Sequence, residues 1–246
     1  MPDLLDQPES TEPSQHDDDA VAPWPHTAFM LAVLAMWALY GAMRSRAHIV
    51  NSMPRPELYA GQMMLQYLLV GTTIAGLYQR RRYLRAMVGV LTAQGVLTDL
   101  GQGFLVYLGG WAVTVALGMV VSPIHLGHDR SAVLAIAPHS AVEMLLWVGV
   151  SVTAGVCEEF VFRGYLLRQF MRWLHGPAAG IALSAMLFAC MHFYEGAAAV
   201  VQIGGLGAFY GYMAVRRGHL RHVMIAHFLQ DALTGLYLFS TFVRTR

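Results

Sequence analysis

The fold is decided by one stretch of the sequence, Cys157-Glu158-Glu159-Phe160-Val161-Phe162-Arg163-Gly164-Tyr165-Leu166. This stretch follows a long apolar run, residues 141–156, and places two adjacent carboxylates and an arginine at its end. Ionisable side chains at membrane depth are costly, so they are candidates for a functional site. The competing interpretation, for this stretch taken alone, is a solvated cluster of charges at a membrane boundary.

Helical geometry separates the two glutamates. Consecutive positions on a helix point about 100° apart, so Glu158 and Glu159 cannot both face one site. Glu159 and Arg163 are spaced i,i+4 with the glutamate on the N-terminal side, which is the favourable order for an ion pair on one helix face. We therefore interpret Glu159 and Arg163 as a structural pair and Glu158 as the reactive carboxylate.

The composition is that of a polytopic membrane protein. Of the 246 residues, 56% are hydrophobic and only 13% are charged, whereas soluble domains carry about 25% charged residues. We expect an all-α transmembrane helical bundle of about seven to eight spans. The net charge of +1 and the lack of a long basic tract argue against binding to nucleic acid. Cys157 and Cys190 both fall in apolar runs, so no disulfide framework is expected.

Apolar runs of spanning length predict seven transmembrane helices. They cover residues 26–43, 58–78, 103–121, 132–156, 177–192, 197–215 and 222–242, and Pro138 interrupts the fourth. Residues 86–102 are only moderately apolar, and we interpret them as an interfacial segment, with an eighth span as the alternative. Residues 162–173 combine arginines with bulky apolar residues, which predicts an amphipathic helix at the membrane surface.

Two further polar sets lie in the C-terminal spans. Phe188-Ala189-Cys190-Met191-His192 ends one predicted span, and His227-Phe228-Leu229-Gln230-Asp231 lies within the last. Seen singly, a histidine at a span end favours headgroup water, and a His–Asp pair can simply bridge helices. With Glu158, however, His192, His227 and Asp231 make up nearly all the candidate proton-transfer or metal-binding groups of these spans. Their apolar surroundings favour one buried site with shifted ionisation.

The three pieces resemble the signature of the CPBP family, the CAAX proteases and bacteriocin-processing enzymes. These are intramembrane endopeptidases, and they include the type II prenyl-protein CAAX protease. The family motifs Glu-Glu-x-x-x-Arg, Phe-x-x-x-His and His-x-x-x-Asn or Asp correspond to residues 158–163, 188–192 and 227–231, in the same order. The resemblance covers about residues 135–243. Asp231 is a departure, because the CAAX proteases carry Asn there.

The resemblance implies peptide hydrolysis at an active site between the C-terminal core helices. This reaction needs a base that activates water and donors that stabilise an oxyanion. Glu158 is the expected base, and His192 is expected to share the water or shuttle its proton. His227 is expected to donate to the oxyanion, while Asp231 fixes the tautomer of His227 or the position of the water. Structural support is expected from Glu159, Arg163 and Phe188.

A metal-dependent mechanism uses the same side chains. Glu158, His192 and His227 could ligate zinc and leave one position open. The sequence lacks His-Glu-x-x-His, the usual helix motif of zinc proteases, and this favours chemistry without a metal or other cofactor.

The chain is expected to have three parts, and the resemblance implies a class of substrate. Residues 1–25 have the composition of a disordered acidic tail, residues 26–131 form N-terminal transmembrane helices, and residues 132–246 form the catalytic transmembrane core. We expect an integral protein of the bacterial inner membrane that cleaves a membrane-anchored or lipidated protein near its terminus. The expected partners are thus this substrate and the lipid bilayer.

Two other functions are weighed against the endopeptidase. The first is a catalytically silent membrane scaffold or immunity protein, but intact Glu158, His192 and His227 argue against it. The second is a proton-coupled transporter, because Glu and His side chains also relay protons across membranes. Transporters commonly contain a repeated half with broken helices at matching positions, and no such repeat is found in the sequence.

Overall fold

The structure is a computed structural model that describes residues 21–46, 53–77, 87–88, 93–124 and 130–244. Within these ranges the chain is a helical bundle without strands, so the predicted all-α fold is confirmed. Its α-helices are α1 (Trp24–Arg46), α2 (Arg55–Leu77), α4 (Ala93–Val121), α5 (Arg130–Ile136), α6 (Ala141–Glu159), α7 (Leu167–Trp173), α8 (Pro177–Cys190), α9 (Ala197–Arg217) and α10 (Arg221–Arg244). A π-helical segment, η4 (Phe160–Leu166), joins α6 to α7, and short 3₁₀ turns occupy η3 (Ser122–Ile124) and η5 (Phe193–Glu195).

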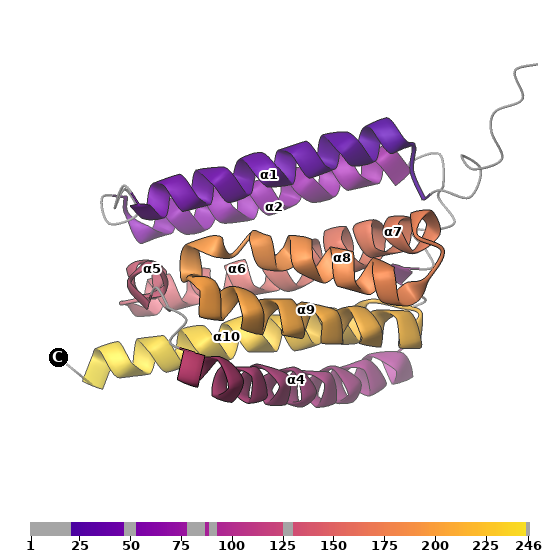
Figure 1. Ribbon diagram of the computed structural model, residues 1–246. Coiled ribbons are helices and arrows are strands. Elements are labelled where there is room, and N and C mark those ends of the chain that lie inside the picture. Colours follow the sequence, from indigo (N-terminus) through magenta and orange to yellow (C-terminus); the bar gives the residue numbers. More distant parts are fainter. Residues whose placement is uncertain (1–20, 47–52, 78–86, 89–92, 125–129, 245–246) are drawn as a thin grey trace, which may run out of the picture.

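The long helices run roughly side by side (Figure 1). α1 and α2 lie along one side of the bundle, α4 lies along the opposite side, and the C-terminal helices fill the space between them. α10 packs against both α4 and α6, α8 packs against α9, and α2 packs against α6. The contact between α2 and α6 brings the N-terminal half of the chain against the helix that carries the two glutamates.

Within the described residues, five helical stretches have the length and apolar composition to cross a membrane: Trp24–Met43, Gly95–Ile124, Ala141–Trp173, Ala197–Arg217 and Arg221–Arg244. Large apolar side chains such as Met36, Met119 and Leu145 are exposed along them, as a lipid-facing surface requires. The protein is therefore an integral membrane protein. The segments that form α2 and α8 were also expected to cross the membrane. Both are helices, but α2 is not among these five stretches, and α8 has only 14 residues.

The expected separation of residues 86–102 from the span at residues 103–121 is wrong for the described part. Residues 93–102 are the first turns of α4, which continues unbroken to Val121. Asp99 lowers the hydropathy of this stretch, but it is 5% exposed and forms an ion pair with Arg221 of α10. Because this charge is neutralised between two helices, α4 extends beyond the purely apolar run.

The expected surface helix at residues 162–173 is also wrong in its first half. Ala141–Trp173 is one continuous helical stretch, and its residues from Phe160 to Leu167 are buried. Arg163 caused the error, because an arginine in a periodic pattern suggests a polar face. Its charge is instead compensated inside the bundle.

The interruption expected at Pro138 is confirmed. α5 ends at Ile136, and α6 begins after Ser140, whose hydroxyl oxygen accepts a hydrogen bond from the backbone N–H of Glu143 at 3.2 Å. The carboxylate of Glu143 in turn accepts from the backbone N–H of His139 at 2.7 Å. This reciprocal cap satisfies N–H groups at the start of α6 that have no partner within the helix.

The described chain begins at Val21, so the expected disordered tail lies outside the described residues up to residue 20. Two residues near the end of the expected tail, Val21 and Ala22, are described and are buried, with exposed fractions of 1% and 2%. The backbone N–H groups of both donate to the side-chain oxygen of Gln169, at 2.8 and 3.1 Å. The entry into α1 is thereby fixed against α7.

Candidate active site

A close approach of α6 to α10 brings the motifs together. Gly155 lies one turn before Glu158. A Cβ atom on Gly155 would come 2.7 Å from the carbonyl oxygen of Met224 and 2.9 Å from the backbone nitrogen of Phe228. Only glycine allows the two backbones to lie so close. Near the other end of the contact, the indole N–H of Trp147 donates to the carbonyl oxygen of Asp231 at 2.9 Å.

Glu159 is the centre of the polar cluster and is completely buried. Its Oε1 accepts hydrogen bonds from Nη1 of Arg163 at 2.9 Å and from Nδ1 of His227 at 2.8 Å. The predicted ion pair of Glu159 with Arg163 is therefore present. The bond to His227 joins the first motif to the third, and it was not predicted because the i,i+4 argument concerns one helix only.

Arg163 is 1% exposed, and three separate helical segments hold it. Besides Glu159, its Nη2 donates to the carbonyl oxygen of Gly207 at 3.2 Å. The guanidinium carbon lies 4.3 Å from the centre of the Phe188 ring, a cation–π contact. A Cβ at Gly207 would lie 3.1 Å from Nη2, so the guanidinium occupies space that a side chain would take. Phe188, expected to give structural support, thus packs on the buried cation.

His227 lies between two carboxylates. Nδ1 contacts Glu159, and Nε2 lies 3.6 Å from Oδ2 of Asp231. Two acceptors on opposite sides of the ring match the two N–H donors of an imidazolium. The carboxylate at hydrogen-bonding distance is that of Glu159, so Glu159 orients the ring. Asp231 lies on the opposite side of the ring, and its expected role, to fix the tautomer of His227 or the position of the water, stays a prediction.

His192 directly follows the last turn of α8 and is partly buried. Its Nδ1 lies 2.9 Å from the carbonyl oxygen of Phe188. A carbonyl oxygen only accepts, so Nδ1 carries a proton, and Nε2 presents a lone pair when the ring is neutral. The ring also stacks near Tyr194, with centres 6.1 Å apart. Burial, followed by the nearby charge of Glu195, raises the pKa of Tyr194, so its phenol stays protonated.

Glu158 is partly buried at the end of α6. Its Oε1 accepts a hydrogen bond at 3.0 Å from Nε2 of Gln66, which lies on α2. His227, Glu158 and His192 lie near enough to Asp231 to interact with it electrostatically. Gln66 was missed by the sequence analysis. The signal that could have found it is an amide within a predicted apolar span, where a polar side chain needs a partner.

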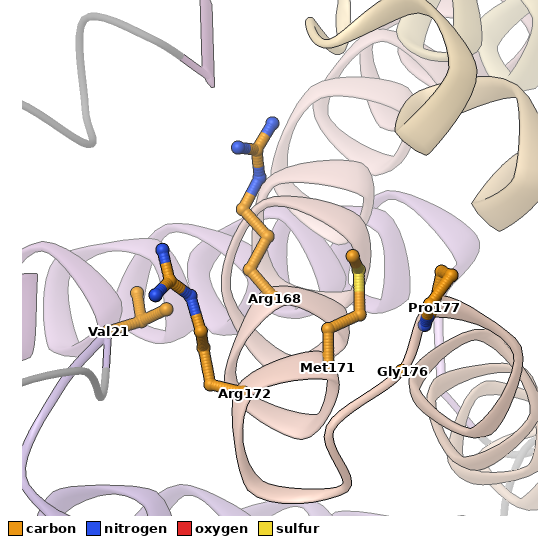
Figure 2. A pocket seen from close by; sticks show the side chains of 6 residues that line it. All are labelled: Val21, Arg168, Met171, Arg172, Gly176 and Pro177. Carbon is orange, nitrogen blue, oxygen red and sulfur yellow. The ribbon is translucent and has the colours of Figure 1, made fainter. Parts of the chain in front are cut away.

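A pocket of about 360 Å³ lies elsewhere, between α7 and the start of α8 (Figure 2). Its lining residues are Val21, Arg168, Met171, Arg172, Gly176 and Pro177, and none of them belongs to the polar cluster. Figure 2 shows the side chains of Arg168 and Arg172 both extending from α7. The predicted site residues gather in the bundle and not at this pocket.

The zinc alternative uses Glu158, His192 and His227 as ligands. Among the residues that the structure describes, no group of three or more His, Cys, Asp or Glu side chains is placed to hold a metal ion. Nδ1 of His227 is bonded to Glu159, and one oxygen of Glu158 is bonded to Gln66. The two cysteines, Cys157 and Cys190, are separate free thiols.

Comparison with known families matches the part of the chain that carries the motifs. Residues 140–233 match the family model described as Rce1-like, type II CAAX prenyl endopeptidase Rce1-like. The match contains all three motifs and confirms the resemblance to the CPBP and CAAX proteases. Neither a curated protein nor a solved structure matches the chain.

Proposed function

Because residues 140–233 match the model of a CAAX prenyl endopeptidase family, we propose that the protein is an intramembrane endopeptidase that cleaves a membrane-anchored or lipidated protein near its terminus. One observation carries the proposal: His227 is held between Glu159 and Asp231 inside the bundle, in electrostatic contact with Glu158. Such an arrangement supplies a base and a charged donor in a site of low polarity, where both act most strongly.

Glu158 is proposed as the base. Its Oε1 is bonded to Gln66, and no described residue donates to Oε2. Oε2 is therefore the oxygen that takes a proton from the attacking water. Nε2 of His192, with its lone pair, accepts the second hydrogen of the same water and so orients it. The water oxygen adds to the peptide carbonyl carbon, and the carbonyl electrons move to the oxygen.

His227 is proposed as the oxyanion donor. With Nδ1 donating to Glu159, Nε2 donates only when the ring is an imidazolium, and this charged donor stabilises the developing oxyanion. The intermediate collapses when the C–N bond breaks. The proton held by Glu158 passes to the leaving nitrogen, which restores the carboxylate.

Asp231 is proposed to balance charge at the mouth of the site. Its side chain is 34% exposed, whereas that of Glu159 is fully buried. The cations Arg163 and His227 are then matched by the anions Glu159 and Asp231. This balance limits the cost of placing four ionised groups in a membrane protein.

The substrate class follows from the family and the surroundings of the site. The matched family is described as a prenyl endopeptidase, and the helices around the site expose large apolar side chains to lipid. We therefore propose a lipid-modified or membrane-anchored C-terminal segment as the substrate, cleaved without a metal in the bacterial inner membrane. A silent scaffold would not need the buried network of Glu159, Arg163 and His227 to be kept beside Glu158.

The proposal is tested with the full chain reconstituted in liposomes. The probe is a farnesylated peptide with a three-residue C-terminal extension, and released tripeptide is measured by mass spectrometry. We expect release by the wild type and none by the Glu158→Gln variant. Equal release by both proteins would contradict the role of Glu158, and intact probe with both would contradict the proposed prenylated substrate.

A further inference from the structure

Gln66 lies outside the matched family segment, yet it contacts the proposed base. It is on α2 and is 1% exposed. The other buried polar side chains of α2 bond to backbone carbonyl oxygens: Thr73 donates to Leu69 at 2.8 Å, and Tyr59 donates to Ile136 at 2.6 Å. Gln66 alone of these three directs its donor to a carboxylate, Oε1 of Glu158.

The orientation of the Gln66 amide is fixed by chemistry. An ionised carboxylate only accepts hydrogen bonds, so the NH₂ end must face Glu158 and the oxygen must point away from it. This oxygen, Oε1 of Gln66, is buried and has no hydrogen-bond partner among the described residues. Buried acceptors are rarely left unpaired, so the orphaned oxygen indicates a donor that arrives with a ligand.

An extended substrate peptide brings that donor. A peptide bond can be cleaved only when its segment is not helical, and its backbone N–H groups then lack partners within the bilayer. A hydrogen-bond acceptor beside the base can accept from one of these N–H groups where the substrate is extended for cleavage. The attacking water does not supply the donor, because its two hydrogens go to Glu158 and His192.

We propose that Gln66 is a positioning and substrate-binding residue of the active site. Its NH₂ group fixes Oε1 of Glu158, so that Oε2 faces the water. Its Oε1 accepts a hydrogen bond from a backbone N–H of the substrate next to the scissile bond. The inference rests on the proposed endopeptidase function, and it makes α2 part of the catalytic centre together with the family segment.

The test compares Gln66→Met with Thr73→Val, in the full chain expressed in host membranes. Both substitutions remove one buried hydrogen bond from α2 with little change in volume, but Thr73 makes its bond within its own helix. Newly formed protein termini that depend on Glu158 are identified first, by comparing wild type with Glu158→Gln. The rate at which the same termini appear is then measured in the two α2 variants, together with their melting temperatures.

We expect Gln66→Met to form these termini at least about tenfold more slowly than Thr73→Val, with similar melting temperatures for both, because a buried polar contact to a charged group is lost. Equal rates in the two variants, or a loss that only follows the melting temperature, would overturn the inference and leave Glu158 as the base. Absence of any Glu158-dependent terminus would overturn the proposed function and this inference together.

A second measurement addresses the substrate N–H directly. Peptides copied from the identified termini are made with an ester in place of the amide next to the scissile bond, which removes one N–H. We expect the ester to lower kcat/KM for the wild type by about tenfold and to have no effect on Gln66→Met, since that variant lacks the acceptor. An equal loss in both proteins would exclude Gln66 as the acceptor.

Discussion

Oε1 of Glu159 lies 2.8 Å from Nδ1 of His227, although the two residues are 68 positions apart in the sequence. This bond ties the end of α6 to the second turn of α10. It also makes Glu159 more than the partner of Arg163, because the same oxygen accepts from both Arg163 and His227. Loss of the Glu159 charge therefore affects the stability of the bundle and the orientation of His227 together.

Glu159→Gln is expected to lower both stability and activity. The substitution leaves the guanidinium of Arg163, which is 1% exposed, without its carboxylate. Breaking a buried ion pair in this way costs about 3–5 kcal/mol. Thermal unfolding in detergent, monitored by circular dichroism, measures the effect. A variant that melts like the wild type but is fully inactive would mean that Glu159, and not Glu158, is the base.

Gly155→Ala is expected to separate α6 from α10. The added Cβ would lie 2.7 Å from a backbone oxygen of α10, which cannot move aside as a side chain can. We expect a destabilisation of about 1–3 kcal/mol and a loss of activity, because Glu159 and His227 move apart.

Gly149→Ala is the matched control for this prediction. It lies on the same helix, and its added Cβ would meet only the sulfur of Met63, at 3.7 Å. We expect an unchanged or slightly higher melting temperature, since alanine favours a helix by up to about 1 kcal/mol over glycine. Equal effects of the two substitutions would contradict the importance of the close helix approach.

Asp231→Asn is expected to retain most of the activity. Nε2 of His227 lies 3.6 Å from Asp231, beyond hydrogen-bonding distance, and Glu159 already orients the ring. The CAAX proteases that the chain resembles carry Asn at this position. We expect kcat/KM to fall by no more than about tenfold, or 1.4 kcal/mol. A loss as large as that of Glu158→Gln would instead place Asp231 among the groups that react.

Chelation is expected to leave activity unchanged. The described donors do not gather into a group that could hold a metal ion, and the proposed steps use only proton transfers between side chains and water. The reconstituted enzyme is dialysed against a strong chelator and assayed before and after zinc is returned. Loss of cleavage that zinc restores would establish the metal-dependent alternative.

Much of this site could be predicted from the sequence, because its motifs are local. The spacing of Glu159 and Arg163 predicts their ion pair from helix geometry alone, and the family match agrees with the order of the motifs. Periodicity could not predict contacts between distant helices. The bond from Gln66 to Glu158 depends on how α2 packs on α6, and the continuation of α4 depends on the pairing of Asp99 with Arg221.

The errors share a physical cause. Hydropathy counts a charged residue as a cost, whether or not a partner neutralises it. Arg163 therefore suggested a surface helix, although its charge is compensated within the bundle by Glu159 and its ring contact with Phe188. Whether a charge inside a membrane bundle is neutralised can be recognised only when the packing of the neighbouring helices is known.

The central claim is that Glu158 activates water for peptide hydrolysis. The most direct test compares the membrane proteome of the native host with that of a chromosomal Glu158→Gln variant, with new protein termini labelled. Glu158 is partly buried and has one hydrogen bond to the protein, so the variant is expected to accumulate and melt like the wild type. The account predicts termini that are present in the wild type and reduced by about 10²–10⁴-fold in the variant. Identical sets of termini, from equally abundant and folded proteins, would contradict it.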